Sequence, residues 1–388
     1  MKGWLIAAVL SIGAPCAIAG DADAPERDGV DAALQHAEAA LEAAVARYPF
    51  VWQAPSWGRG HFGEPDGAGY PTKVAPLYRK LGELYLLEGR DFARGYLLIA
   101  QSAAFEDDLA KARTAFEQGL SVAPSADLGY GVGWCMLRQA NEESMQGRSP
   151  QQIMEAISKF EHALSLDPNH TVSLNSLGYC HYWLAVLAHA TEPPRVDPEK
   201  WPYHVDSALS AWQRYLERGP ATSTIYYLMG ELCHSRGDYA KTAHYWELAL
   251  ELGGDRPGAG QLVQLYEHDL KDPQRAEAVL EEAVKREQAS GRVGSVMTGL
   301  GAERQLAYFW IRHGKHEKAI QFFARRAKER PSAWMFYELG LALEAAGRPA
   351  DALLWYRRAQ ERDPAYMINH LREAIERVSA ASEPGRRD

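Results

Sequence analysis

One pattern of side-chain size recurs along most of the chain. A small residue, a large apolar residue and a second small or apolar residue follow at intervals of four and three, which places them on one face of an α-helix. A proline often follows five residues later and ends the helix, because its ring removes a backbone donor and clashes with the preceding turn. Seven segments carry the pattern in full or in part, and they begin at Ala112, Ala156, Ala208, Thr242, Ala276, Ala319 and Ala352.

The distances between these segments indicate an internal repeat. Successive leading residues lie 44, 52, 34, 34, 43 and 33 residues apart. A second motif, Leu-Gly or a close variant, precedes most of the segments and stands at Leu81, Leu177 and Leu339. Each unit therefore reads as two helices, in which small residues allow close approach and large residues fill the space between hairpins. The three long intervals imply insertions, and we expect insertions at residues 94–109, where the first hairpin is lengthened, 188–203 and 287–298.

Residues 237–250 carry the pattern in its clearest form, and with them the chain resembles tetratricopeptide repeat proteins of the exported bacterial type. The resemblance implies an all-α, right-handed α-solenoid of about seven helix hairpins, with an N-terminal extension and a C-terminal capping helix. The array is expected over residues 75–366, the capping helix over 367–380 and a tail over 381–388. The expected repeats span residues 75–126, 127–170, 171–222, 223–256, 257–290, 300–332 and 333–366.

The first nineteen residues have the pattern of a signal peptide. Lys2 precedes a short apolar stretch, and Ala17 and Ala19 form the small-x-small site that signal peptidase accepts, so we expect cleavage after Ala19 and a periplasmic or secreted protein. Cys16 suggests a lipoprotein as the alternative, but Pro15 stands where a small residue is needed. Residues 20–74 then combine an amphipathic helix near 29–47 with an aromatic, Gly- and Pro-rich segment at 49–75.

Composition narrows the possible partners. The 388 residues carry a formal charge of −9, which disfavours nucleic acid as a partner, and no apolar run approaches the length of a membrane span. Three of the four cysteines lie beyond the predicted signal peptide, and no CxxC motif is present. They are either buried apolar residues or one disulfide with one free thiol, and they are Cys135, Cys180 and Cys233.

The resemblance places the first helix of each hairpin on a concave surface. Tyr and Arg predominate among the residues at its inward positions, and both are common in binding hot spots. We therefore expect a protein or an extended peptide as the partner. Arg79 and Glu83 stand where the chaperone-binding members have Lys and Asn, so that activity is not carried over. The candidate binding residues are Arg79, Glu83, Arg138, Asn175, Tyr179, Tyr182, Tyr227, Glu231, His234, Gln261, His268, Arg304, Tyr308 and Tyr337.

No catalytic motif of the GxSxG, SxxK, HExxH or dinucleotide-binding kind is present. The sequence thus predicts a protein that is not an enzyme and uses neither a cofactor nor a metal. Two alternatives stay open. The chain could be an assembly subunit of a cell-envelope complex, using its outer face and insertions. It could also be an envelope enzyme or a small-ligand-binding protein, with residues 49–75 as a lid. The sequence leaves the identity of the partner, the pathway and the oligomeric state open.

Overall fold

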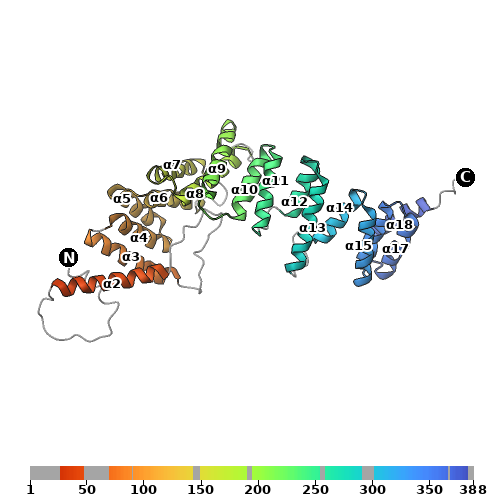
Figure 1. Cartoon of the computed structure of the whole chain (residues 1–388), viewed down its shortest axis with the longest axis horizontal. Coiled ribbons are helices and arrows are strands. Elements are labelled where there is room, and N and C mark those ends of the chain that lie inside the picture. The colour runs from red at the N-terminus through yellow and green to blue at the C-terminus, as the bar shows by residue number, and fades with distance from the viewer. Residues whose placement is uncertain are drawn as a thin grey trace, which may run out of the picture. The chain divides into compact units, whose positions relative to one another are not determined.

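The computed structural model describes residues 27–47, 70–89, 91–142, 149–189, 195–253, 258–290, 301–365 and 368–382. Within these ranges the regular structure is helical throughout, without a strand, which confirms the predicted all-α repeat solenoid (Figure 1). The chain forms two compact units, Met1–Ala221 and Thr222–Asp388. The predicted signal peptide, most of the aromatic-rich segment and most of the tail lie outside the described residues. No described helix is both long enough and apolar enough to cross a bilayer.

The first unit begins with α2, which is the helix expected near residues 29–47. Tyr85 of α3 donates its hydroxyl hydrogen to Glu42 of α2 at 2.5 Å, and Arg94 of α4 binds the same carboxylate at 3.3 Å. These contacts attach the N-terminal helix to the hairpin that follows. The helices are α2 (Arg27–Arg47), α3 (Tyr70–Glu88), α4 (Phe92–Phe105), α5 (Leu109–Val122), α6 (Ala126–Glu142), α7 (Pro150–Leu166), α8 (Thr171–His189), the 3₁₀ turn η1 (Pro198–Lys200) and α9 (Trp201–Leu216).

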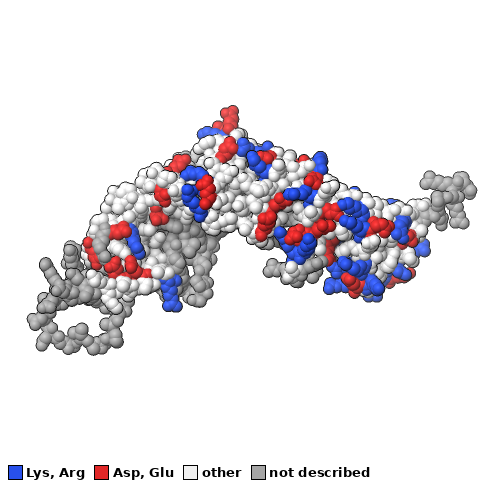
Figure 2. All heavy atoms as spheres, in the orientation of Figure 1, with Lys and Arg blue, Asp and Glu red and all other residues white. Residues whose placement is uncertain are grey.

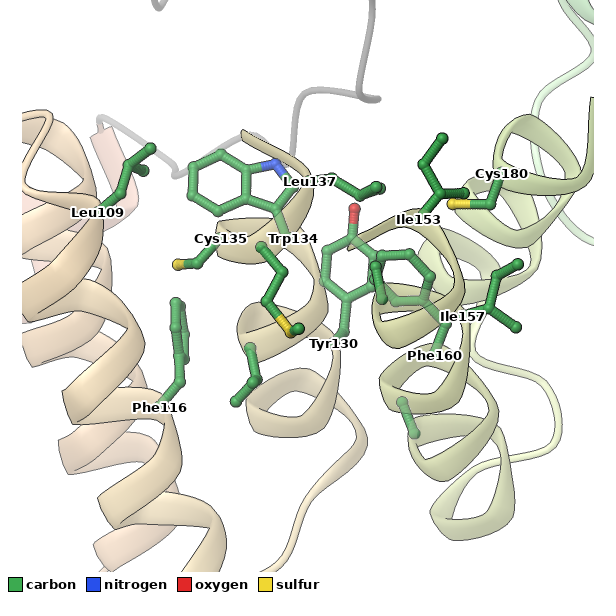
Figure 3. Close-up of a cluster of buried hydrophobic side chains, with 14 of the residues drawn as sticks. Leu109, Phe116, Tyr130, Trp134, Cys135, Leu137, Ile153, Ile157, Phe160 and Cys180 are labelled. Carbon is green, nitrogen blue, oxygen red and sulfur yellow. The ribbon is translucent and has the colours of Figure 1, made fainter. Parts of the chain in front are cut away.

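Large buried rings from successive helices form the core of the first unit. Phe116 of α5, Trp134 of α6 and Phe160 of α7 are almost completely excluded from solvent (Figure 3). The ring of Tyr130, also on α6, lies 5.2 Å from that of Phe160, and its hydroxyl is 3.1 Å from Ser176 of α8. The core thus continues from one hairpin to the next, as expected for stacked repeats.

The second unit has the same organisation. Its most extensive helix contacts are α10 with α11 and α16 with α17, and α18 covers α17 with buried Leu371, Ala374 and Val378. The expected capping helix at 367–380 is therefore α18. The helices are α10 (Ser223–Ser235), α11 (Tyr239–Glu251), α12 (Ala259–Gln264), the π-helical turn η2 (Leu265–Asp269), α13 (Pro273–Ser290), α14 (Ala302–Arg312), α15 (His316–Glu329), α16 (Ala333–Ala345), α17 (Pro349–Arg362) and α18 (Ile368–Ser382).

The glycines of the first helices explain the Leu-Gly motif. A Cβ atom on Gly178 of α8 would lie 2.3 Å from Nε1 of Trp212 on α9, and one on Gly340 of α16 would lie 2.4 Å from Cε1 of Tyr356 on α17. Only a residue without a side chain leaves room for these rings. The glycine of the Leu-Gly motif in the first helix and the large aromatic residue of the second helix are therefore in direct contact within one hairpin.

One predicted insertion is wrong. Residues 94–109 were expected as an insertion, but they form most of α4 and the turn into α5. Asp91 caps α4 through the backbone N–H of Arg94, and Asp108 caps α5 through that of Lys111. The range 75–126 consequently contains three helices. The predicted insertion at 188–203 contains the end of α8, η1 and the start of α9, and the one at 287–298 contains the end of α13; parts of both lie outside the described residues.

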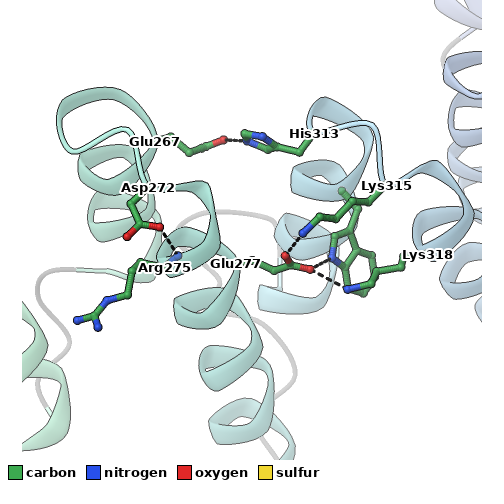
Figure 4. A network of polar contacts seen from close by, with 8 residues as sticks. Glu267, Asp272, Arg275, Glu277, His313, Lys315 and Lys318 are labelled. Atoms are coloured by element: carbon green, nitrogen blue, oxygen red, sulfur yellow. Dashed lines mark hydrogen bonds and ion pairs between the residues drawn. The ribbon is translucent and has the colours of Figure 1, made fainter.

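A buried carboxylate joins α13 to the next hairpin. Glu277 accepts hydrogen bonds from Lys315, from Lys318 at 2.9 Å and from the indole N–H of Trp310 at 2.7 Å (Figure 4). Burial acts to raise the pKa of Glu277, but these hydrogen bonds outweigh burial and hold it at about 2. The contact therefore favours the ionised form of the carboxylate and fixes α13 against α14 and α15.

A second carboxylate reinforces this junction. Glu267 of η2 accepts from Arg312 at 3.0 Å and from Nε2 of His313 at 2.5 Å (Figure 4 shows the histidine contact). Glu287, near the end of α13, accepts from the backbone N–H of Ala302 at 2.9 Å, which satisfies an otherwise unpaired donor at the start of α14. Three glutamates of η2 and α13 thus position α14, the helix that carries Arg304 and Tyr308.

Candidate functional site

The predicted binding residues of α8 surround Trp212 of α9. The indole N–H of Trp212 donates to Oδ1 of Asn175 at 3.2 Å. The ring of Tyr179 meets the indole edge-on at 5.4 Å, and that of Tyr182 lies 6.2 Å away. Burial raises the pKa of Tyr179 to about 12. Tyr179 is thus a neutral, largely enclosed side chain, whereas Asn175 and Tyr182 are only half-buried.

In the second unit, two predicted residues of α10 stack on Trp246 of α11. The ring of Tyr227 lies 6.4 Å from that of Trp246, and His234 lies 5.6 Å from it, both within about 16° of parallel. Glu231 lies between them on α10 and is half-buried. Trp246 itself is buried against Gly230, so Tyr227 and His234 rest on a fixed ring.

The third cluster joins α14 to α16 around a buried carboxylate. Glu338 is completely excluded from solvent and accepts hydrogen bonds from Arg304 and, at 2.5 Å, from the hydroxyl of Tyr308. The guanidinium of Arg304 lies 4.7 Å from the ring of Trp334 and 5.4 Å from that of Tyr308. Burial and the Glu338 hydrogen bond raise the pKa of Tyr308 to about 12. Arg304 and Tyr308, both predicted as binding residues, are therefore already ordered by the fold.

Sequence reasoning missed Glu338 and Trp334. A usable signal was the separation of 34 residues between Arg304 and Glu338, which equals the repeat length and places them on successive first helices. Tyr337, which was predicted, lies beside Tyr356 with its ring 5.6 Å away, and burial raises its pKa.

The other predicted residues are dispersed. Arg79 of α3 pairs with Glu106, and Arg138 of α6 binds Asp107 at 3.3 Å and lies 5.4 Å from the ring of Trp134. Both pairs bind the turn between α4 and α5.

Three further predicted residues have little contact with the clusters. Gln261 accepts from the backbone N–H of Gly258 at 3.1 Å and so caps α12. Glu83 of α3 and His268 of η2 are exposed. For these positions a role in binding stays a prediction.

A buried pair of histidines joins α8 to α9. Nδ1 of His181 lies 3.0 Å from Nδ1 of His204, and both side chains are almost fully buried. Burial, together with the neighbouring His204, lowers the pKa of His181 to about 4. Within the described ranges, no three His, Cys, Asp or Glu residues come together as a metal site would require.

The three cysteines beyond the predicted signal peptide are separate, buried thiols. Cys135, Cys180 and Cys233 form no disulfide, so the buried-residue interpretation is correct and the disulfide alternative is wrong. Burial raises the pKa of the Cys135 thiol to about 12 and that of Cys233 to about 11.

Charged side chains over the second unit are of mixed sign. Figure 2 shows Lys and Arg beside Asp and Glu over α13–α17, without a broad field of one sign on the visible face. Several of these neighbours are ion pairs, such as Arg275 with Glu247 at 3.0 Å and Arg286 with Glu282 at 3.3 Å.

Family models for the tetratricopeptide repeat match residues 93–125, 204–259 and 311–366. The chain carries tetratricopeptide repeats. The match over 93–125 covers α4 and α5, so these helices form a repeat of their own and the predicted insertion at 94–109 is part of it. The other two matches cover the helices from α9 to α11 and from α15 to α17.

Solved structures of tetratricopeptide repeat proteins show a distant likeness. A tetratricopeptide repeat protein from Parabacteroides merdae is 14% identical over 74% of this chain and 99% of its own, with a TM-score of 0.36. YrrB, described as having an unusual peptide-binding site, is 14% identical over 67% and 99%, with a TM-score of 0.27. Human IFIT1 in a dimer with PPP-AAAA is 13% identical over 85% and 69%, with a TM-score of 0.37. No match to a curated protein sequence is found.

Proposed function

We propose that this protein is an exported, non-enzymatic scaffold whose first helices bind an extended peptide or protein segment. Tetratricopeptide repeats in general suggest a protein- or peptide-binding scaffold. The observation that supports the finer proposal is a half-buried tyrosine on each of four first helices, α8, α10, α14 and α16, each beside a fixed ring or carboxylate. These tyrosines are Tyr182, Tyr227, Tyr308 and Tyr337.

Fixed tyrosines suit this task for an energetic reason. A tyrosine offers a large contact area and one polar group, and it has few side-chain torsions to order on binding. Packing against Trp246 restricts Tyr227 before any ligand arrives. Side chains ordered in advance lose less conformational entropy on association, which favours affinity.

Affinity capture from an envelope fraction with the tagged chain, followed by mass spectrometry, tests the proposal. Tyr227→Ala on α10 should weaken binding of an isolated partner at least about tenfold, which corresponds to about 1.4 kcal/mol. Tyr245→Ala is the matched control, because Tyr245 is also half-buried but lies on α11, the second helix of the same hairpin. Equal binding by wild type and both variants would contradict binding at the first helices.

Export is proposed from residues 1–19 and has its own test. The chain recovered from the periplasmic fraction or the medium should begin at Gly20 when its intact mass is measured. A chain that keeps Met1 and stays in the cytosolic fraction would contradict export but would not affect the proposal about binding.

A further inference from the structure

Arg304 is a candidate ligand-binding residue whose positive charge is already matched inside the protein. Its Nη2 nitrogen donates to Glu338 and, at 3.4 Å, to the hydroxyl of Tyr308. Glu338 is fully buried, whereas 24% of the Arg304 side chain stays exposed. The pair is therefore neutral as a whole, but its cationic member reaches the surface of α14.

Arg304 keeps unused hydrogen-bond donors. A guanidinium has five N–H groups, and the hydrogen bonds of the described residues use only those on Nη2. Its Nε atom is buried without a hydrogen-bond partner among the described residues. The ring of Trp334, 4.7 Å away, supports the guanidinium from another side. The side chain is thus held in place while its Nη1 group stays available to an acceptor.

The surroundings disfavour a charged acceptor. The Glu338 carboxylate is completely buried against the Arg304 guanidinium, from which it accepts a hydrogen bond. A ligand carboxylate beside Arg304 would therefore place a second negative charge near a guanidinium whose charge Glu338 already balances. A carbonyl oxygen can accept the same hydrogen bond without that repulsion.

Resting on the binding surface proposed above, we infer that Arg304 donates a hydrogen bond to an uncharged carbonyl of the bound peptide. Glu338 makes the site select against Asp, Glu and terminal carboxylates at this position. Trp334 supplies half-buried aromatic surface beside it, so the preferred segment is neutral and apolar. Glu338 acts through Arg304 and is a positioning residue that sets specificity.

A phage-displayed library of random peptides, selected on the full chain, tests this inference. Glu338→Gln keeps the size of the side chain but leaves Arg304 with a net positive charge, so the selected peptides should gain Asp or Glu by about tenfold at one position. Glu344→Gln is the matched control, since it makes the same change on the same helix and leaves the Arg304–Glu338 pair intact. Wild type and the control should both select peptides poor in acidic residues.

Two results would overturn the inference: acidic peptides selected by wild type, or the same peptides selected before and after Glu338→Gln. If Glu338→Gln fails to fold by circular dichroism, Arg304→Lys takes its place. That variant keeps the charge but loses the planar fork, so it should bind the wild-type peptides at least about tenfold more weakly, and equal binding would overturn the inference.

Tyr227→Ala separates this inference from the proposed function. Peptides that depend on Tyr227 but ignore Glu338 leave the binding surface standing and overturn only the specificity. A library that yields no peptide enriched on wild type overturns the proposed function, and the specificity with it.

Discussion

Gly340 is a position at which one added methyl group tests the packing of a hairpin directly. It lies on α16 with the ring of Tyr356, from α17, directly above its backbone. Gly340→Ala would normally stabilise a helix interior, because glycine is about 1 kcal/mol less favourable there than alanine. The contact with Tyr356 predicts the opposite result.

The expected size follows from the distances. The new Cβ atom would lie 2.4 Å from Cε1 and 2.6 Å from Cδ1 of Tyr356, whereas carbon atoms in contact are normally about 3.5 Å or more apart. The ring cannot yield easily, since it is fully buried and its hydroxyl donates to Glu344 at 2.7 Å. Overpacking costs about 1–3 kcal/mol, and a ring that cannot move aside places Gly340→Ala in the upper part of that range, at about 2–3 kcal/mol. After the gain in helix propensity, we expect a net loss of about 1–2 kcal/mol in the free energy of unfolding.

Thermal and urea denaturation followed by circular dichroism measure this loss. For a unit of this size the Tm should fall by about 2–8 °C. Gly260→Ala on α12 is the matched control, because its Cβ atom would meet nothing closer than Oε1 of Gln305 at 3.7 Å. That variant should be neutral or more stable by up to about 1 kcal/mol. If Gly340→Ala melts at or above the wild-type temperature, the close contact with Tyr356 does not limit the hairpin.

Three further predictions concern titratable groups. The pKa of His181, about 4, is below its ordinary value of 6.5, so the folded state resists protonation and the free energy of unfolding falls as the pH drops from 6.5 to 4. Between pH 7 and pH 5, wild type should lose about 2 kcal/mol more than His181→Gln when both are unfolded in urea. Equal pH slopes for the two proteins would contradict this prediction. Glu277→Gln should lower the free energy of unfolding by about 2 kcal/mol at pH 7, because ionised Glu277 stabilises the fold above its ordinary pKa and this contribution is lost as the pH falls toward 2. Glu281→Gln, exposed on the same helix, should change stability by less than about 0.5 kcal/mol. Equal losses in the two variants would contradict a stabilising role for the Glu277 hydrogen bonds. Burial raises the pKa of the Cys135, Cys180 and Cys233 thiols. A thiol reagent should therefore modify none of the three in the native protein and all three after denaturation. A thiol that reacts without denaturant would contradict its burial.

The hairpins could be predicted because their packing rule is local. Gly178 has no Cβ atom, and the ring of Trp212 lies where that atom would be. Both residue types can be read directly from the sequence. The spacing of such pairs along the chain therefore predicts the hairpins. Helix α4 gave no comparable signal, because α3 and α5 enclose it so completely that even Gln101 and Ser102 are buried. A helix without a polar face shows little periodicity, and its sequence was read as an insertion.

The candidate site was only partly predictable, because its polar groups are satisfied across repeats. Arg304 and Tyr308 were expected to meet a ligand, and much of their hydrogen bonding goes instead to Glu338. An acidic residue in a first helix is ordinarily assigned to the surface, and nothing in its immediate neighbours marks Glu338 as buried. Its environment depends on a helix one repeat earlier, which no local pattern describes.

Glu338 also limits how this array could change its length. Repeats that contact only their neighbours through apolar faces can be duplicated or lost one at a time. A deletion that removed α14 and α15 would take away Arg304 and Tyr308 and leave the Glu338 carboxylate buried without a donor, which costs about 3–5 kcal/mol. The hairpins α14–α15 and α16–α17 should therefore be inherited, exchanged or transplanted into designed proteins as one block.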